Sequence, residues 1–218
     1  MTDGEGGRGL RTALLAIMSV ALLLLGGGIA VALGIGRTEV PAADSVDAGF
    51  ARDMAAHHLQ GVEMADLALE RSTDPAVRGL AFDISSTQTN QTGRMQGWLV
   101  LWGVPLTGGE VMAWMSESGD AHSGHGMDMS GALMPGMATD EELAELGTLT
   151  GTDFDVEFLR LMIRHHQGGT GMADDAAEHA DVAAVRSLAG SISRSQGVET
   201  AVMTTMLTER GGTPLPAP

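Results

Sequence analysis

The stretch FARDMAAHHLQGVEMA, residues 50–65, recurs as FLRLMIRHHQGGTGMA at residues 158–173. An offset of 108 residues aligns residues 50–99 with residues 158–207 without a gap, and 22 of the 50 aligned pairs are identical. The identical pairs include two adjacent histidines, the methionines on either side of them and a glycine that follows. The chain therefore contains an internal duplication, and its period is too long for a solenoid unit.

Each copy has the pattern of a helical hairpin. Apolar residues recur at helical spacing, and Asp74-Pro75 combines a capping residue with proline at the first helical position. The expected helices span about residues 47–71 and 75–101 in the first copy, and about 153–180 and 182–209 in the second. A single hairpin cannot bury both of its apolar stripes. We therefore expect an all-α fold in which two duplicated hairpins form a four-helix bundle with approximate two-fold symmetry.

The expected organisation places this bundle after an N-terminal anchor. Residues 1–11 form a short N-terminus, residues 12–36 the anchor, residues 45–209 the bundle domain and residues 210–218 a disordered tail. Within the domain, copy 1 covers about 45–102, a linker about 103–150 and copy 2 about 151–209. The linker is expected to be a mobile loop as far as Gly136. A capping box at Thr139 then opens a short helix that continues through Leu146.

The N-terminal anchor is predicted from an uncharged run at residues 13–35. About 20 apolar residues suffice for a helix to span a bilayer. Arg8 and Arg11 precede the run, which predicts a cytoplasmic N-terminus and a bundle domain outside the membrane. A cleaved signal peptide is the alternative, although its apolar region is normally only about 7 to 15 residues long. Both interpretations make the bundle domain extracytoplasmic.

The composition excludes several classes of protein. The chain of 218 residues has no cysteine, so it has no disulfide, thiolate site or lipidated cysteine. Its 12 basic residues are all arginine and face 28 acidic residues, for a formal net charge of −16. Nucleic-acid binding needs a basic surface, so no nucleic-acid partner is expected. An acidic surface instead attracts cations.

The duplicated motif predicts a metal site. On a helical wheel one face of each first helix carries two imidazoles and two thioethers, with small residues between them. These candidate ligands are His57, His58, Met54 and Met64 in the first copy, and His165, His166, Met162 and Met172 in the second. The symmetry of the bundle either joins both faces at one site or leaves two separate sites. An architectural role for the histidines is the alternative.

The choice of metal follows from this ligand set. Thioether and imidazole together favour copper, above all Cu(I) over Cu(II). Zinc seldom uses methionine, because its usual ligands are cysteine, histidine and carboxylate. Silver and zinc nevertheless stay open.

The linker carries a second group of candidate ligands in HSGHGMDMSGALMPGM, residues 122–137. Short histidine-rich tracts commonly bind metal, and core packing does not explain methionines in a glycine-rich loop. The candidates are His122, His125, Met127, Met129, Met134 and Met137. A plain flexible linker is the alternative.

The second helices carry further residues that both copies share. Gln88 and Gln196 lie on otherwise apolar faces, and we expect each to make a buried hydrogen bond to a histidine. Met95 and Met203 are expected in the core. The tryptophans are expected to anchor the linker or the hairpin end, and they are Trp98, Trp102 and Trp114.

The motif of Phe158–Ala173 resembles the hallmark of the domain-of-unknown-function 305 family, and the resemblance extends over about residues 45–209. It implies an extracytoplasmic, ferritin-like helical bundle, with a link to copper binding and copper tolerance in some members. The first copy departs from the pattern, because HHLQG stands where the second copy has HHQGG. Equal roles for Gln60 and Gln167 are therefore not expected. A di-iron site would need Glu-x-x-His on the helices, and that motif is absent from the sequence.

These observations predict a membrane-anchored, extracytoplasmic copper-binding protein that sequesters copper or exchanges it with a donor or acceptor protein. We expect binding and not catalysis, since no nucleophile–base pair or paired-carboxylate signature is present. A copper-dependent redox enzyme, resembling a cuprous oxidase, and a metal-free helical interaction module are the alternatives.

Overall fold

The computed structural model describes residues 3–34, 40–116 and 134–218, with side chains from residue 11 onward. The chain divides into two compact units, Met1–Val40 and Pro41–Pro218. The described residues contain helices and no strand, so the predicted all-α class is confirmed. The helices are α1 (Asp3–Ala32), α2 (Val46–Arg71), α3 (Pro75–Trp102), α4 (Ala113–Ser116), α5 (Asp140–Leu146), α6 (Gly151–His179) and α7 (Ala183–Glu209).

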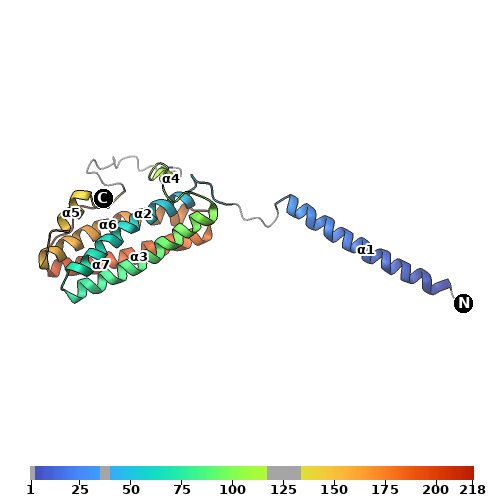
Figure 1. The fold of residues 1–218 in the computed structure, drawn as a ribbon, viewed down its shortest axis with the longest axis horizontal. Helices are drawn as coiled ribbons and strands as arrows, with labels where there is room; N and C mark the ends of the chain where they lie inside the picture. Colours follow the sequence, from blue (N-terminus) through green and yellow to red (C-terminus); the bar gives the residue numbers. More distant parts are fainter. Residues whose placement is uncertain (1–2, 35–39, 117–133) are drawn as a thin grey trace. The chain divides into compact units, whose positions relative to one another are not determined.

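The first unit consists largely of α1 (Figure 1). Its segment Arg11–Ala32 has a mean hydropathy of 2.5 and is long and apolar enough to cross a membrane. Its leucines are exposed within the protein, Leu23 for example by 76%. An exposed apolar helix of this kind is typical of a membrane span and also of a signal sequence. The cytoplasmic N-terminus and the uncleaved anchor stay predictions.

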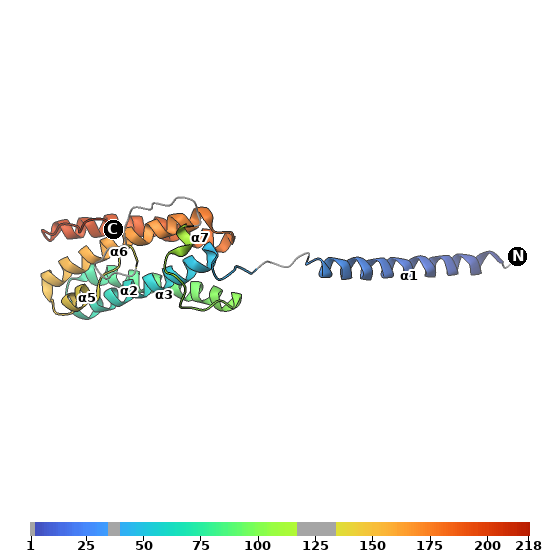
Figure 2. The ribbon, with the colours of Figure 1, turned by 90° about the horizontal axis from the view of Figure 1, so that it is seen from above.

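The second unit contains the four long helices, which run alongside one another in two views (Figures 1 and 2). Helices α2 and α3 form one hairpin, α6 and α7 form the other, and the hairpins meet chiefly where α2 contacts α6. The same hydrogen bond between the two helices of a hairpin recurs in both copies. Ser85 donates to Asp66 at 2.8 Å, and Ser193 donates to Asp174 at 2.6 Å. The predicted hairpins are therefore present, and their bounds agree within about two residues with the expected ones.

The helix starts follow the expected capping chemistry. Asp74 accepts hydrogen bonds from the first turn of α3. Thr139 and Glu142 form the complete capping box of α5. Asp47 joins the two copies, because its carboxylate accepts the backbone N–H groups that precede α7, from Asp181 at 3.1 Å and Val182 at 2.9 Å.

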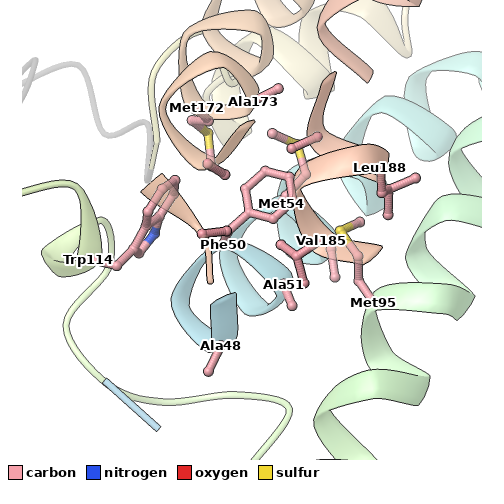
Figure 3. Close-up of a cluster of buried hydrophobic side chains, with 14 of the residues drawn as sticks. Ala48, Phe50, Ala51, Met54, Met95, Trp114, Met172, Ala173, Val185 and Leu188 are labelled. Carbon is pink, nitrogen blue, oxygen red and sulfur yellow. The ribbon is translucent and has the colours of Figure 1, made fainter. Parts of the chain in front are cut away.

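The bundle encloses two apolar clusters. Phe50, Met54 and Met172 lie in the first cluster, with Trp114 at its edge (Figure 3). The second cluster is built around Phe154, Phe158 and Leu161. Met95 lies in the first and Met203 in the second, both fully buried, so their predicted place in the core is confirmed.

Two segments outside the long helices pack against the bundle. Trp114 anchors the first part of the linker, since its indole N–H donates to Asp53 at 2.9 Å and its ring meets Phe50 edge-on at 5.8 Å. The tail that the sequence predicts to be disordered makes two contacts with the bundle, since the carbonyl of Thr213 accepts from Arg160 at 3.2 Å and Leu215 packs against the second cluster.

Candidate metal centre

The four helical histidines meet where α2 contacts α6. The ring centroids of His57 and His165, one from each copy, are 3.9 Å apart. His58 and His166 lie farther out, at 6.4 and 6.2 Å from the rings of their sequence neighbours. None of the four side chains is exposed. The symmetry therefore brings the imidazoles of both copies into one buried histidine cluster.

The four helical methionines divide between the two apolar clusters. Met54 and Met172 lie together in the first cluster, and Met64 and Met162 lie together in the second. Each pair contains one methionine from each copy. The thioethers therefore flank the histidine cluster along the helices in two groups, and do not converge on a single point with all four imidazoles.

Hydrogen bonds define which nitrogen of each imidazole carries the proton. In all four rings Nε2 faces an oxygen acceptor, with the amide of Gln91 placed so that its oxygen faces His58, and Nε2 therefore donates the hydrogen bond. The two inner histidines bond backbone carbonyls: His57 bonds that of Pro135 at 3.2 Å, and His165 bonds that of His57 at 3.0 Å. The two outer histidines bond side chains: His58 bonds Gln91 Oε1 at 2.7 Å, and His166 bonds Glu199 Oε2 at 2.7 Å. The Nδ1 atom of a neutral imidazole in this tautomer presents a lone pair, which is the form that binds metal.

Burial keeps the imidazoles of His57, His58 and His165 neutral. Desolvation lowers the pKa of His57 from 6.5 to about 4, with an opposing contribution from the hydrogen bond to Pro135. Desolvation, followed by the charge that His57 would carry, lowers the pKa of His58 to about 3. The pKa of His165 falls well below 6.5 for the same two reasons. At neutral pH these three rings are ligands that need not lose a proton before they bind a cation.

The cluster contains buried polar atoms without hydrogen-bond partners in the described part of the chain. The Nδ1 atoms of all four histidines are in this state, and so are both side-chain amide atoms of Gln88 and Gln196. Buried polar groups are nearly always satisfied by protein, water or an ion. The lone pairs at Nδ1 and the amide oxygens therefore indicate a place for a bound species.

Glycine allows the two copies to approach this closely. A Cβ atom at Gly61 would lie 2.2 Å from Gln88 Oε1 and 3.0 Å from Cε1 of His165. The same relation recurs at Gly169, with 2.7 Å to Gln196 Oε1 and 3.1 Å to Cε1 of His57. The glycine that follows each histidine pair thus admits the imidazole of the other copy.

The expectation for Gln88 and Gln196 is wrong in one respect. Both are buried, but neither donates to nor accepts from a histidine among the described hydrogen bonds. That role belongs to Gln91 and Glu199, one helical turn further along α3 and α7. The alignment at an offset of 108 pairs these two positions, but they are not among the identical pairs because one is glutamine and the other glutamate.

The end of the linker covers the histidine cluster. Residues 134–138, which we call the strap, follow the part of the linker outside the described residues. Its carbonyl at Pro135 holds His57, and both amide atoms of Gln60 bond the backbone of Ala138, at 2.7 and 2.9 Å. Gln167 makes no such clamp, and its Oε1 atom has no partner in the described structure. The unequal roles expected for Gln60 and Gln167 are confirmed.

The linker ligands fall into two groups. Met134 and Met137 belong to the strap and are only 5% and 7% exposed, within the first apolar cluster. The expectation that core packing does not involve them is wrong, because the strap brings both side chains into the bundle. The remaining four lie outside the described residues: His122, His125, Met127 and Met129.

Residues 11–34, 40–116 and 134–218 contain no group of three or more histidine, aspartate or glutamate side chains that could hold a metal ion. A structural zinc site needs four such ligands in a tetrahedron. The four imidazoles are therefore not arranged around a single metal position in the described structure, and the thioethers lie beside them in two separate groups.

The fold and site define an all-helical protein with an internal duplication and a buried cluster of histidines between methionines. The sequence model of the domain of unknown function DUF305 matches residues 47–207, and the chain belongs to this family. No curated protein matches the chain.

Solved structures of the family share the fold. A DUF305 protein of Streptomyces coelicolor, for which secretion has been suggested, is 44% identical with a TM-score of 0.71, and the match covers 80% of this chain and 99% of that one. A DUF305 fragment from Deinococcus radiodurans is 32% identical with a TM-score of 0.61, covering 75% and 96%. CopM in its Cu(II)-bound form is 29% identical with a TM-score of 0.58, covering 76% and 97%. The Cu(I)-bound form of CopM is 25% identical with a TM-score of 0.57.

Proposed function

We propose that this protein binds copper outside the cytoplasm, held at the membrane by α1, and that it sequesters the ion or passes it to a partner protein. The observation that carries the proposal is the histidine cluster, whose four Nδ1 atoms are buried and without hydrogen-bond partners in the described structure. Copper-bound CopM, a relative with the same fold, supports the choice of metal.

The chemistry of the cluster favours Cu(I) as the ion first captured. Imidazole and thioether suit Cu(I), and the apolar clusters on both sides suit an ion of low charge. Met54 and Met172 offer sulfur on one side of the histidines, and Met64 and Met162 on the other. Silver shares this preference for soft ligands. The role is binding and not turnover, and an assay with a redox substrate tests the alternative of an oxidase.

Access to the cluster requires local opening, because all four rings are fully buried. The strap lies over His57 through the carbonyl of Pro135. We expect the linker residues that precede the strap in the sequence to capture copper first, and these are His122, His125, Met127 and Met129. Loading of the buried cluster then follows more slowly.

The test is an anaerobic titration of the full chain in detergent with Cu(I) against a competing chelator. One variant replaces the four clustered histidines with alanine, and a milder one carries only His58→Gln and His166→Gln. The matched control is His179→Ala, on α6 but outside the cluster, where the imidazole pairs with Asp175.

Three outcomes separate the interpretations. Loss of tight binding in the cluster variants, with helical circular dichroism retained and the control unchanged, supports the proposal. Unchanged binding in the cluster variants assigns the metal to the linker and makes the buried histidines architectural. If the parent chain does not bind copper, the proposal fails and a metal-free interaction module takes its place.

A further inference from the structure

The two copies differ at one position that touches the histidine cluster. Gln91 in α3 and Glu199 in α7 are aligned by the duplication, and each accepts a hydrogen bond from Nε2 of the outer histidine of its own copy at 2.7 Å. His58 and His166 are both fully buried, with unpartnered Nδ1 atoms. One imidazole therefore faces a neutral amide and the other a carboxylate.

We propose that Glu199 is a positioning residue that makes His166 a stronger electron donor than His58, and that it thereby favours Cu(II) over Cu(I) in the histidine cluster. This inference rests on the proposed copper binding by the histidine cluster. A carboxylate behind a ligating imidazole orients the ring and increases the donor strength of its other nitrogen. The negative charge also stabilises a doubly charged ion more than a singly charged one.

The geometry of Glu199 fits this role. Its side chain is 27% exposed while His166 is fully buried, so the carboxylate reaches from the edge of the bundle to the ring. Among the described residues the partner of its carboxylate is the imidazole of His166 and not an arginine. The charge of the carboxylate therefore acts on the imidazole and is not neutralised by a cationic side chain in direct contact.

The surroundings of Gln91 allow a carboxylate to be introduced in the first copy by Gln91→Glu. Gln91 lines a groove of about 310 Å³ between α3 and α7, together with hydroxyl and amide side chains. The groove also contains Arg94. Because position 91 lines this groove, the carboxylate of Gln91→Glu would lie at a polar groove and not in the apolar core.

The experiment compares Glu199→Gln, Gln91→Glu and the double exchange in the full chain in detergent. All are made in a background in which His122, His125, Met127 and Met129 are replaced, so that the linker does not contribute. Affinities for Cu(II) and for Cu(I), the latter under anaerobic conditions, are measured separately by chelator competition. The reduction potential of the bound copper is measured independently by a redox titration.

We expect Glu199→Gln to weaken Cu(II) binding by about 10- to 100-fold, the usual effect of removing such a partner, and Cu(I) binding by much less. Each tenfold loss of Cu(II) affinity relative to Cu(I) affinity raises the reduction potential by about 59 mV for a one-electron couple. Gln91→Glu should shift the ratio in the opposite direction. The double exchange should return it toward the parent, because it moves the carboxylate to the other copy.

The two proposals fail differently. If the parent background binds copper in the histidine cluster and Glu199→Gln leaves the ratio of the two affinities unchanged, Glu199 has no electronic role and this inference is wrong. An equal loss for both oxidation states has the same meaning, since a purely structural residue would act in that way. If the parent background binds neither ion, the copper proposal itself fails and this inference falls with it.

Discussion

The close contact between the strap and α6 leads to a quantitative prediction for Gly168→Ala. A Cβ atom at Gly168 would lie 2.0 Å from the carbonyl oxygen of Pro135 and 2.8 Å from the backbone nitrogen of Gly136. Both neighbours are backbone atoms, so a side-chain rotation cannot relieve the overlap. The strap must move away from the helix, and it then loses the bond to His57 and strains the clamp on Ala138.

The magnitude follows from two opposing effects. Alanine is favoured over glycine inside a helix by about 1 kcal/mol. Overpacking costs about 1–3 kcal/mol, and each displaced hydrogen bond about 1 kcal/mol more. We expect Gly168→Ala to lower the free energy of unfolding by about 1–3 kcal/mol, because the clash and the lost bonds outweigh the gain in helix propensity.

Gly171→Ala is the matched control, because it lies on the same helix and its Cβ would meet nothing within 4 Å. It should stabilise the protein by about 0.5–1 kcal/mol. Urea unfolding followed by circular dichroism measures both variants, and limited proteolysis at residues 134–138 detects local release of the strap. If Gly168→Ala is as stable as Gly171→Ala and the strap stays protected, the close contact does not exist in solution.

Two further predictions concern the whole bundle. Asp47→Ala should destabilise it by about 1–2 kcal/mol in thermal unfolding, because the two N–H groups before α7 lose their acceptor, and an unchanged midpoint would contradict this. Stability should also fall as the pH drops from 6.5 toward 5, since the unfolded chain binds protons on His57 and His58 that the folded chain does not. The loss should reach about 2–4 kcal/mol in urea unfolding and should be smaller in a variant with both residues changed to glutamine.

The secondary structure and the ligand types followed from local features of the sequence. Helical periodicity and capping residues act over three or four positions, so Asp74 and Thr139 predicted the starts of α3 and α5. The alignment of the copies placed His57 and His58 on one face with Met54 and Met64. The predicted fold class is confirmed, whereas the metal ligation by these residues stays a prediction.

Contacts between distant residues were decided only by the tertiary structure. The partners of His57 and His165 lie 78 and 108 residues away, and their positions depend on how α2 packs on α6 and how the strap lies over them. The same packing buries Met134 and Met137, which the glycine-rich composition had suggested were exposed. A sequence pattern records which chemical groups share a helix face. The proton positions, the burial and the carboxylate of Glu199 behind one imidazole arise from contacts between helices, which have no local periodicity to reveal them.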